Sequence, residues 1–137
     1  MAWYAIDAVT LLHLVEQDLS PGDGHRLVAP DSIRSQVMER LLADVRQGTR
    51  RDADALRLHE RMTGLKLRLL GDRVSRTVAW RLAREHEGMT LRQAEYLAIA
   101  RLQAEALVTI DETLAALATG LVPLAGLPQL LAPAPEG

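Results

Sequence analysis

The 137-residue chain contains no cysteine and no phenylalanine, and it has only two tryptophans and two tyrosines. Without cysteine the protein can form neither a disulfide bond nor a thiolate metal site, which fits a reducing cytoplasm. With so few aromatic side chains, leucine, valine, isoleucine and alanine must fill the interior. Hydrophobic residues make up 48% of the chain and charged residues 25%, a balance that predicts one globular domain with a single core.

The chain also lacks a strong excess of either charge, because its formal net charge is −2 at pH 7. This excludes a global basic field of the kind that draws proteins nonspecifically onto nucleic acid, so any nucleic-acid site must be local. Of the 16 basic residues, all but Lys66 are arginine. The guanidinium group suits bidentate phosphate contacts, although a compositional bias towards arginine is the simpler explanation.

No apolar run approaches the roughly 20 residues that a membrane span requires, and the opening AWYAID does not resemble a signal peptide. We therefore expect a soluble, cytoplasmic protein with no membrane partner. The last six residues, 132–137, read APAPEG and offer nothing to a core, so we expect a disordered tail. Residues 1–131 then form the domain.

Residues 90–111 are the most informative stretch, because an amphipathic helix there leads into a short apolar strand that ends on a carboxylate. Thr90 and Gln93 have the spacing of a capping box, in which two side chains satisfy free backbone donors at a helix start. Residues 106–110, ALVTI, are continuously apolar apart from one threonine, and Asp111 follows. A strand buried on both faces is typical of a parallel sheet.

The start of the chain repeats this pattern, with a predicted strand over residues 3–6, Asp7, and a helix that ends near Gln17. Further strands are predicted at 26–29, 65–70 and 122–124. Between the strands we predict four more helices. The first is capped by Asp31 or Ser32 and ended by Gly48, the second is a charged helix over 50–63, the third is capped by Asp72, and the fourth is a short helix over 113–119. This alternation predicts a three-layer α/β/α sandwich with a mostly parallel sheet of four or five strands.

Asp7 and Asp111 each follow a predicted strand, and the carboxyl ends of parallel strands share one edge of a sheet. Both carboxylates should therefore face one crevice. Two acids in a crevice suggest a hard cation, because Mg²⁺ takes oxygen ligands and needs only one or two protein carboxylates when a phosphate completes its shell. Spacing alone leaves a second reading open, in which each aspartate simply caps the helix that follows it.

From residue 2 to about residue 131 the chain resembles PIN domains of the VapC-like toxin type. The matching motifs are YAIDAVTLL, LVAPDSI, AWRLAREHEGMT, QAEYLAIA and LVTID, in family order. The resemblance implies a metal-dependent ribonuclease of a toxin–antitoxin pair, which holds Mg²⁺ or Mn²⁺ with about four acidic residues, forms a homodimer and binds a small antitoxin. Two of those acids fall on Asp7 and Asp111.

The other two acidic positions of the family pattern are occupied by Gln36 and Gln93. A carboxylate about 4 Å from a cation contributes roughly 4 kcal/mol gross per unit charge at an effective dielectric of 20, whereas a carboxamide contributes only a dipole. We therefore expect weak binding of Mg²⁺ or Mn²⁺ by Asp7 and Asp111, and slow or absent RNA cleavage. Glu39, three residues after Gln36 on the same helix, is the candidate substitute for a catalytic acid.

Thr109 and Glu112 are further site candidates beside Asp111. The Thr109 hydroxyl suits a phosphate or a neighbouring acid, although a threonine in a strand needs no function. Glu112 suits a metal, and it equally suits the first turn of a helix, where a carboxylate complements the dipole.

Two classes of function remain open. In the first, the protein is a VapC-like ribonuclease that hydrolyses RNA with a metal-held water; in the second, the PIN fold is a catalytically inactive module that binds RNA or a protein partner. We interpret Ala53, Leu56 and Met62 as a thin apolar stripe on the charged helix over 50–63. With the helix around Gln36, it is the predicted surface for a homodimer or an antitoxin-like small protein.

Overall fold

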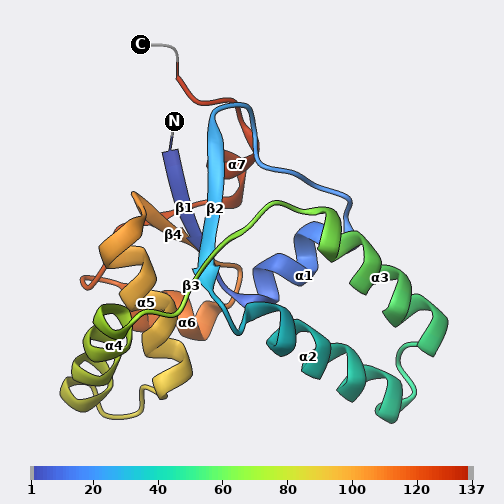
Figure 1. The fold of residues 1–137 in the computed structure, drawn as a ribbon, viewed down its shortest axis with the longest axis horizontal. Coiled ribbons are helices and arrows are strands. Elements are labelled where there is room, and N and C mark those ends of the chain that lie inside the picture. Colours follow the sequence, from blue (N-terminus) through green and yellow to red (C-terminus); the bar gives the residue numbers. More distant parts are fainter. Residues whose placement is uncertain (1, 136–137) are drawn as a thin grey trace.

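The computed structural model describes residues 2–135, which fold around a five-stranded sheet with the order β3-β2-β1-β4-β5 (Figure 1). Every neighbouring pair of strands is parallel. The strands are β1 (Ala2–Ile6), β2 (His25–Pro30), β3 (Arg68–Leu70), β4 (Ala106–Val108) and β5 (Leu124–Ala125). The helices are α1 (Ala8–Glu16), α2 (Ile33–Gln47), α3 (Asp52–Gly64), α4 (Arg73–Glu85), α5 (Leu91–Gln103), α6 (Glu112–Ala118) and α7 (Leu127–Leu131). The predicted α/β/α sandwich with a parallel sheet is confirmed.

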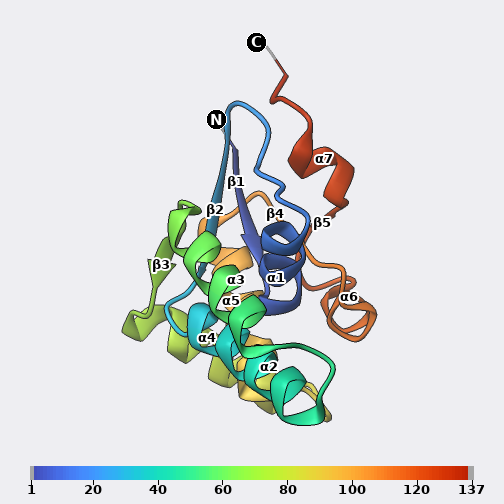
Figure 2. The same cartoon turned by 90° about the vertical axis from the view of Figure 1, so that its right-hand side faces the viewer.

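Helices cover both faces of this sheet. In Figure 1, α1, α2 and α3 lie on one side of the strands, and α4 and α5 lie on the other. Helix α5 packs directly on β1, β2 and β4, while α4 packs against α5. Figure 2 shows α6 and α7 beside β5, at the opposite edge of the sheet from β3. Since α5 lies between the sheet and α4, its residues 96–100 are all buried, whereas Leu91 and Leu102 near its ends are exposed.

Two helix starts follow the predicted capping residues. The Asp72 carboxylate accepts a hydrogen bond from the Ser75 backbone N–H at 2.9 Å, which begins α4. At the start of α5, the Thr90 hydroxyl accepts from the Gln93 N–H at 3.0 Å, and the Gln93 side chain accepts from the Thr90 N–H at 2.9 Å. The reciprocal capping box predicted from the sequence is therefore present.

The predicted capping of α2 by Asp31 or Ser32 is wrong. Ser32 occupies the cap position, but no side chain caps the helix there. The backbone of Ser32 is already helical, and its hydroxyl accepts a hydrogen bond from Gln36 instead. The predicted end of this helix is confirmed, because Gly48 follows it in the left-handed region with φ 80°, which glycine adopts without steric cost.

The buried face of α3 differs from the predicted one, although Met62 is buried as expected. In α3 the core residues are Ala55, Leu58 and Met62, whereas Ala53 and Leu56 are exposed. In α4 the buried residues are Ser75, Ala79 and Leu82, whereas Val74 is exposed and Val78 is half-buried. Each helix carries two apolar stripes, and packing against α1 and α2, or against α5, decides which stripe is covered.

The C-terminal part of the chain contains one element that the sequence did not reveal. Strand β5 starts after Pro123 and is an edge strand, as predicted, but helix α7 was not predicted, and its Leu130 is fully buried. The Ala134 N–H donates to the Asp23 carbonyl at 2.7 Å. Residues 136 and 137 lie outside the described residues, and the disorder expected of 132–137 stays a prediction. Between residues 2 and 135, every helix is too short or too polar to span a bilayer.

Candidate functional site

The ends of β1 and β4 lie side by side in the sheet, and Asp7 and Asp111 follow these strands. A pocket of about 360 Å³ opens beside them, lined by both aspartates and by residues of α2 and α5. Gln36, Glu39 and Gln93 belong to this lining. Residues that are up to 104 positions apart in the sequence therefore share one cavity (7 to 111). The predicted placement of Asp7 and Asp111 in one crevice is confirmed.

Asp7 is the most buried carboxylate of the pocket, with 3% of its surface exposed. Its Oδ1 accepts a hydrogen bond from the Thr10 N–H at 3.4 Å and another from the Thr10 hydroxyl. The Thr10 oxygen accepts in turn from the Ile110 N–H at 3.0 Å, which ties α1 to the segment after β4. Burial raises the pKa of Asp7, because leaving water disfavours the charged form more than hydrogen bonds from Thr10 and Thr109 favour it.

Asp111 is half-buried and begins α6. Its Oδ1 accepts from the backbone N–H groups of Thr113 at 2.9 Å and Leu114 at 3.3 Å. Asp7 and Asp111 are thus both N-caps, so the simpler reading of these residues as caps is also correct in its geometry. The caps use Oδ1 of each carboxylate, which leaves Oδ2 as the atom for a ligand.

Gln36 is 6% exposed, and both ends of its carboxamide are engaged. Its Nε2 donates to the Ser32 hydroxyl at 2.9 Å, and its Oε1 accepts from the Tyr96 hydroxyl. The Tyr96 oxygen accepts from the Ala8 N–H at 3.2 Å. Burial, and next the charge of Asp7, raises the pKa of Tyr96, so this hydroxyl keeps its proton. Gln36 is therefore held as a neutral member of a hydrogen-bonded network.

The remaining polar groups of the pocket come from α2 and α5. Gln93 uses its Oε1 in the capping box with Thr90. Glu39 reaches across from α2 to pair with Arg92 of α5 at 3.2 Å, and Arg40 also lines the pocket. The side chains of Arg92 and Glu39 are 55% and 66% exposed, so their ion pair contributes about 0–1 kcal/mol and can rearrange around a ligand.

Thr109 and Glu112 do not line the pocket. The Thr109 hydroxyl accepts from the Asp111 N–H at 3.0 Å, and Glu112 lies in the first turn of α6, as its helix-dipole reading predicts. The sequence predicted no site role for four residues, which are Thr10, Arg40, Arg92 and Tyr96. The spacing of three from Asp7 was a usable signal for Thr10. Arg92 had none, because its contact with Glu39 spans 53 positions.

Within residues 2–135, no three acidic or histidine side chains are placed to hold a metal ion together. Asp7 and Asp111 have the chemistry for one loosely held Mg²⁺ or Mn²⁺, completed by phosphate and water oxygens. They do not fit a two-ion cluster, since the carboxamides of Gln36 and Gln93 bring no negative charge to bridge two cations.

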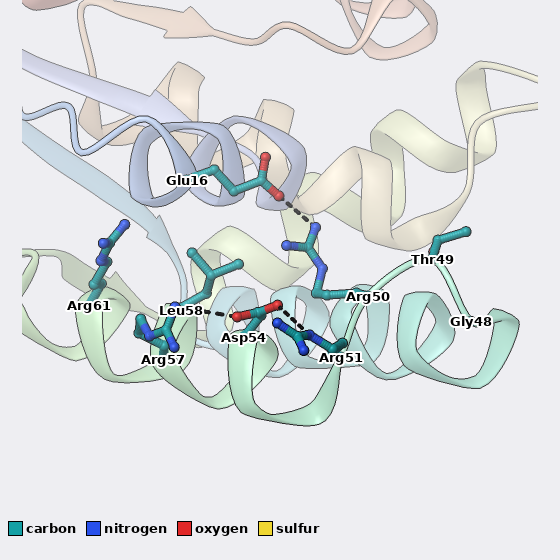
Figure 3. A pocket seen from close by; sticks show the side chains of 9 residues that line it. All are labelled: Glu16, Gly48, Thr49, Arg50, Arg51, Asp54, Arg57, Leu58 and Arg61. Carbon is teal, nitrogen blue, oxygen red and sulfur yellow. Dashed lines mark hydrogen bonds and ion pairs between the residues drawn. The ribbon is translucent and has the colours of Figure 1, made fainter.

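A second hollow, of about 510 Å³, lies at the start of α3. Figure 3 shows the side chains that line it. Its lining includes Arg50, Arg51, Arg57 and Arg61. Carboxylates occupy three of these guanidinium groups: Arg50 pairs with Glu16 at 2.7 Å and with Asp44 at 3.2 Å, and Asp54 pairs with Arg51 and Arg57 at 3.6 and 3.3 Å. This hollow holds none of the predicted site residues.

The same fold occurs in a protein of known structure. The chain matches the crystal structure of PAE2754 from Pyrobaculum aerophilum with a TM-score of 0.69 and 23% sequence identity, over 95% of this chain and 94% of that one. At this identity the likeness establishes the fold. No protein-family model matches the chain, and no curated protein sequence matches it.

The Tyr96 hydroxyl should be a main support of the pocket. Tyr96→Phe leaves the Ala8 N–H and the Gln36 oxygen without a partner in a buried setting, so we expect the free energy of unfolding to fall by about 1–3 kcal/mol. Urea denaturation measures this change. The control is Tyr4→Phe, which removes a single 3.2 Å bond from Gln129 and should have the smaller effect. Equal losses in the two variants would show that the Tyr96 network has no special role.

The raised pKa of Asp7 should make stability depend on pH. A carboxyl whose pKa is higher in the folded than in the unfolded protein contributes stability that is complete below its ordinary value of 3.8 and is lost as the pH rises through the folded pKa. Asp7→Asn keeps an acceptor for Thr10 and cannot ionise. In EDTA, its stability relative to the parent should therefore increase as the pH rises above 3.8.

Asp72 provides a control of opposite sign. Its pKa is lowered, chiefly by the hydrogen bonds from Ser75, so its contribution is present above 3.8 and is lost at lower pH. Asp72→Asn should therefore lose stability relative to the parent at neutral pH. A difference between Asp7→Asn and the parent that stays constant from acid to neutral pH would contradict the burial argument for Asp7.

Proposed function

We propose that this chain is a PIN-like ribonuclease that binds RNA phosphate in the pocket of Asp7 and Asp111 and hydrolyses RNA slowly, with a single weakly held Mg²⁺ or Mn²⁺. One observation supports this proposal above the others. The four positions at which the VapC-like resemblance expects acids are Asp7, Gln36, Gln93 and Asp111, and all four line the same pocket. A chance resemblance in sequence would give no reason for these four side chains to meet.

In this proposal, Asp7 and Asp111 hold the cation through their Oδ2 atoms. Asp7 favours such a partner, because a desolvated carboxylate gains more from a nearby cation than one in water does. The chemistry that a bound Mg²⁺ supplies is a lower pKa for water and partial neutralisation of the phosphate charge. Arg40 and Arg92 bind phosphate oxygens, for which the guanidinium geometry is suited.

Glu39 has two roles in the same proposal. It orients Arg92 in the absence of RNA, and it is the one further carboxylate among the described residues that line the pocket. When a phosphate takes over Arg92, the Glu39 carboxylate becomes free to accept a proton from a water molecule, as a general base requires.

A specific observation favours the alternative, a PIN-fold module that binds RNA or a protein partner without cutting it. Gln36 and Gln93 already donate or accept hydrogen bonds that support the protein itself. Both glutamines therefore have structural roles. A site with these residues in place of two acids suits binding of a ligand without cleavage. The charge-restoration experiment below separates the two functions.

We also propose α2 and α3 as the face that contacts a second copy of the chain or an antitoxin-like small protein. The correction to α3 supports this choice, because Leu56 does not belong to the core and is 58% exposed. Leu42 of α2 is 47% exposed. Exposed leucines on a highly charged surface are the kind of thin apolar contact that a partner covers.

Restoring charge to the pocket should strengthen metal binding. We expect the double variant Gln36→Glu with Gln93→Asp to bind Mn²⁺ at least about tenfold more tightly than the parent, since each added carboxylate contributes several kcal/mol gross before desolvation. It should also increase metal-dependent cleavage of RNA. Calorimetry with Mn²⁺ and a gel assay measure the two effects, and a further Asp7→Asn change should abolish both.

The matched control is Gln17→Glu with Gln103→Glu, which adds the same two charges at exposed positions outside the pocket. It should leave metal affinity and cleavage unchanged. Brisk, Asp7-dependent cleavage by the unmodified chain would contradict a weakened site and would make Glu39 the first residue to substitute. Tighter Mn²⁺ binding without any cleavage would favour the binding module.

The partner proposal predicts self-association. Light scattering on the concentrated protein should give a mass above that of one chain, and Leu56→Glu should lower it because the new charge is buried at the contact. Val74→Glu is the control, since Val74 is also 58% exposed but lies on α4. A single-chain mass at every concentration would remove the homodimer and leave the small-protein partner.

A further inference from the structure

A groove runs along the open edge of β2, away from the pocket of Asp7. Its volume is about 1020 Å³, and it is lined by residues 20–24, by His25, Arg26 and Leu27 of β2, by Trp3 and Arg34, and by residues 63–68. Strand β3 pairs with β2 only from Val28 onwards, so residues 25–27 have no strand on their outer side. The connection from α3 to β3 runs beside this part of β2 (Figure 1). We call this feature the edge groove.

The edge groove concentrates positive charge in a chain whose net charge is −2. Its basic residues are Arg26, Arg34, Lys66 and Arg68, and its acidic residue is Asp23. Across residues 2–135, these four cations take part in no ion pair. The hollow of Figure 3 differs in this respect, because carboxylates neutralise most of its arginines. The basic side chains of the edge groove are therefore available to bind an anionic ligand.

The indole ring of Trp3 contacts two of these basic side chains. The guanidinium carbons of Arg26 and Arg68 lie 5.9 and 5.5 Å from the centre of the indole ring. Sheet register explains the cluster: Trp3 is opposite Arg26, and Arg68 is opposite Val28, two residues further along the same face of β2. Cation–π contacts hold the two guanidinium groups in place, so they lose little freedom when they bind an anion.

Two residues of the edge groove each contain a buried polar atom without a hydrogen-bond partner among residues 2–135. Arg34 Nε and His25 Nδ1 are shielded from solvent and have no hydrogen-bond partner within residues 2–135. Both residues line the edge groove. A buried donor without a partner costs about 1–3 kcal/mol, and a phosphate oxygen that reached Arg34 would remove this cost.

We propose that the edge groove binds single-stranded RNA, with phosphates on Arg26, Arg34 and Arg68 and a base stacked on the cluster of Trp3 and its arginines. Basic side chains that alternate with an aromatic platform are the usual means of binding single strands. An acidic peptide would use the charge but would gain nothing from the platform. The choice of RNA rests on the proposed function, since Trp3 and Asp7 are about 13 Å apart along β1 at ~3.3 Å per residue, within reach of a few nucleotides.

The fluorescence of Trp3 can be used to measure binding in the edge groove. Trp80 is 61% exposed on α4, so Trp80→Phe leaves Trp3 as the one tryptophan without disturbing the core. In this background and in EDTA, a twelve-nucleotide oligouridylate should quench Trp3 fluorescence in a saturable, salt-dependent manner. Arg26→Gln with Arg68→Gln should weaken this binding at least about tenfold, and it should reduce the slope of log Kd against log salt by roughly 1.4, at ~0.7 per lost phosphate contact.

The matched control is Arg81→Gln with Arg84→Gln, which removes the same charge from exposed positions of α4. It should change the affinity no more than about twofold. An equal loss in the two double variants would overturn the proposal, because binding would then follow net charge alone. Polyglutamate that quenched Trp3 as strongly as the RNA would also overturn it and would assign the edge groove to an acidic protein.

This test fails separately from that of the proposed function. Metal-dependent cleavage should be absent in EDTA, and Asp7→Asn should leave the quenching of Trp3 unchanged. A chain that binds the oligouridylate here but never cleaves RNA would retain the edge groove and lose the ribonuclease. Cleavage without any quenching of Trp3 would retain the ribonuclease and overturn the proposal for the edge groove.

Discussion

A carboxylate buried at the end of β1 is the constraint on which the rest of the site depends. A charge that leaves water must find donors or neutralise itself, and Asp7 finds Thr10, whose hydroxyl also accepts the Ile110 N–H. On the other side of this strand end, Tyr96 joins the Ala8 backbone to Gln36. The two networks fasten α1, α2, α5 and the segment after β4 to one point. The hydrogen bonds that position the side chains of the pocket therefore also connect the helices to the sheet.

The glutamines follow from the same constraint. Acids at positions 36 and 93 would bring like charges towards Asp7, whose carboxyl is already hard to ionise because it is buried. Neutral carboxamides remove that repulsion and serve the fold, Gln36 through Ser32 and Tyr96 and Gln93 through the capping box. In the proposed ribonuclease, the same glutamines would weaken metal binding, because a dipole replaces a charge.

The distribution of arginines gives the protein three electrostatic surfaces that its net charge conceals. Around α3, three of the four arginines that line the hollow are paired with Glu16, Asp44 and Asp54, so carboxylates offset most of that surface's positive charge. In the Asp7 pocket Arg92 is held by an exposed and replaceable pair with Glu39. In the edge groove the cations have no carboxylate partner among residues 2–135, and Trp3 orders two of them. An anion at the edge groove would therefore break no ion pair between described residues, whereas at the other two surfaces it would compete with a carboxylate for the arginines.

Local rules in the sequence determined the alternation of strands and helices, the caps at Asp72 and Thr90, and the placement of Asp7 and Asp111 after parallel strands. These features depend on residues a few positions apart, and the edge shared by the two aspartates follows from strand direction alone. Tertiary structure decided the buried stripes of α3 and α4, because the sequence offers two on each. It also decided the contacts of Tyr96 with Gln36 and of Arg92 with Glu39, which span 60 and 53 positions. No local pattern encodes such partners, since only the fold of the chain around the sheet brings residues of α2 and α5 to the same pocket.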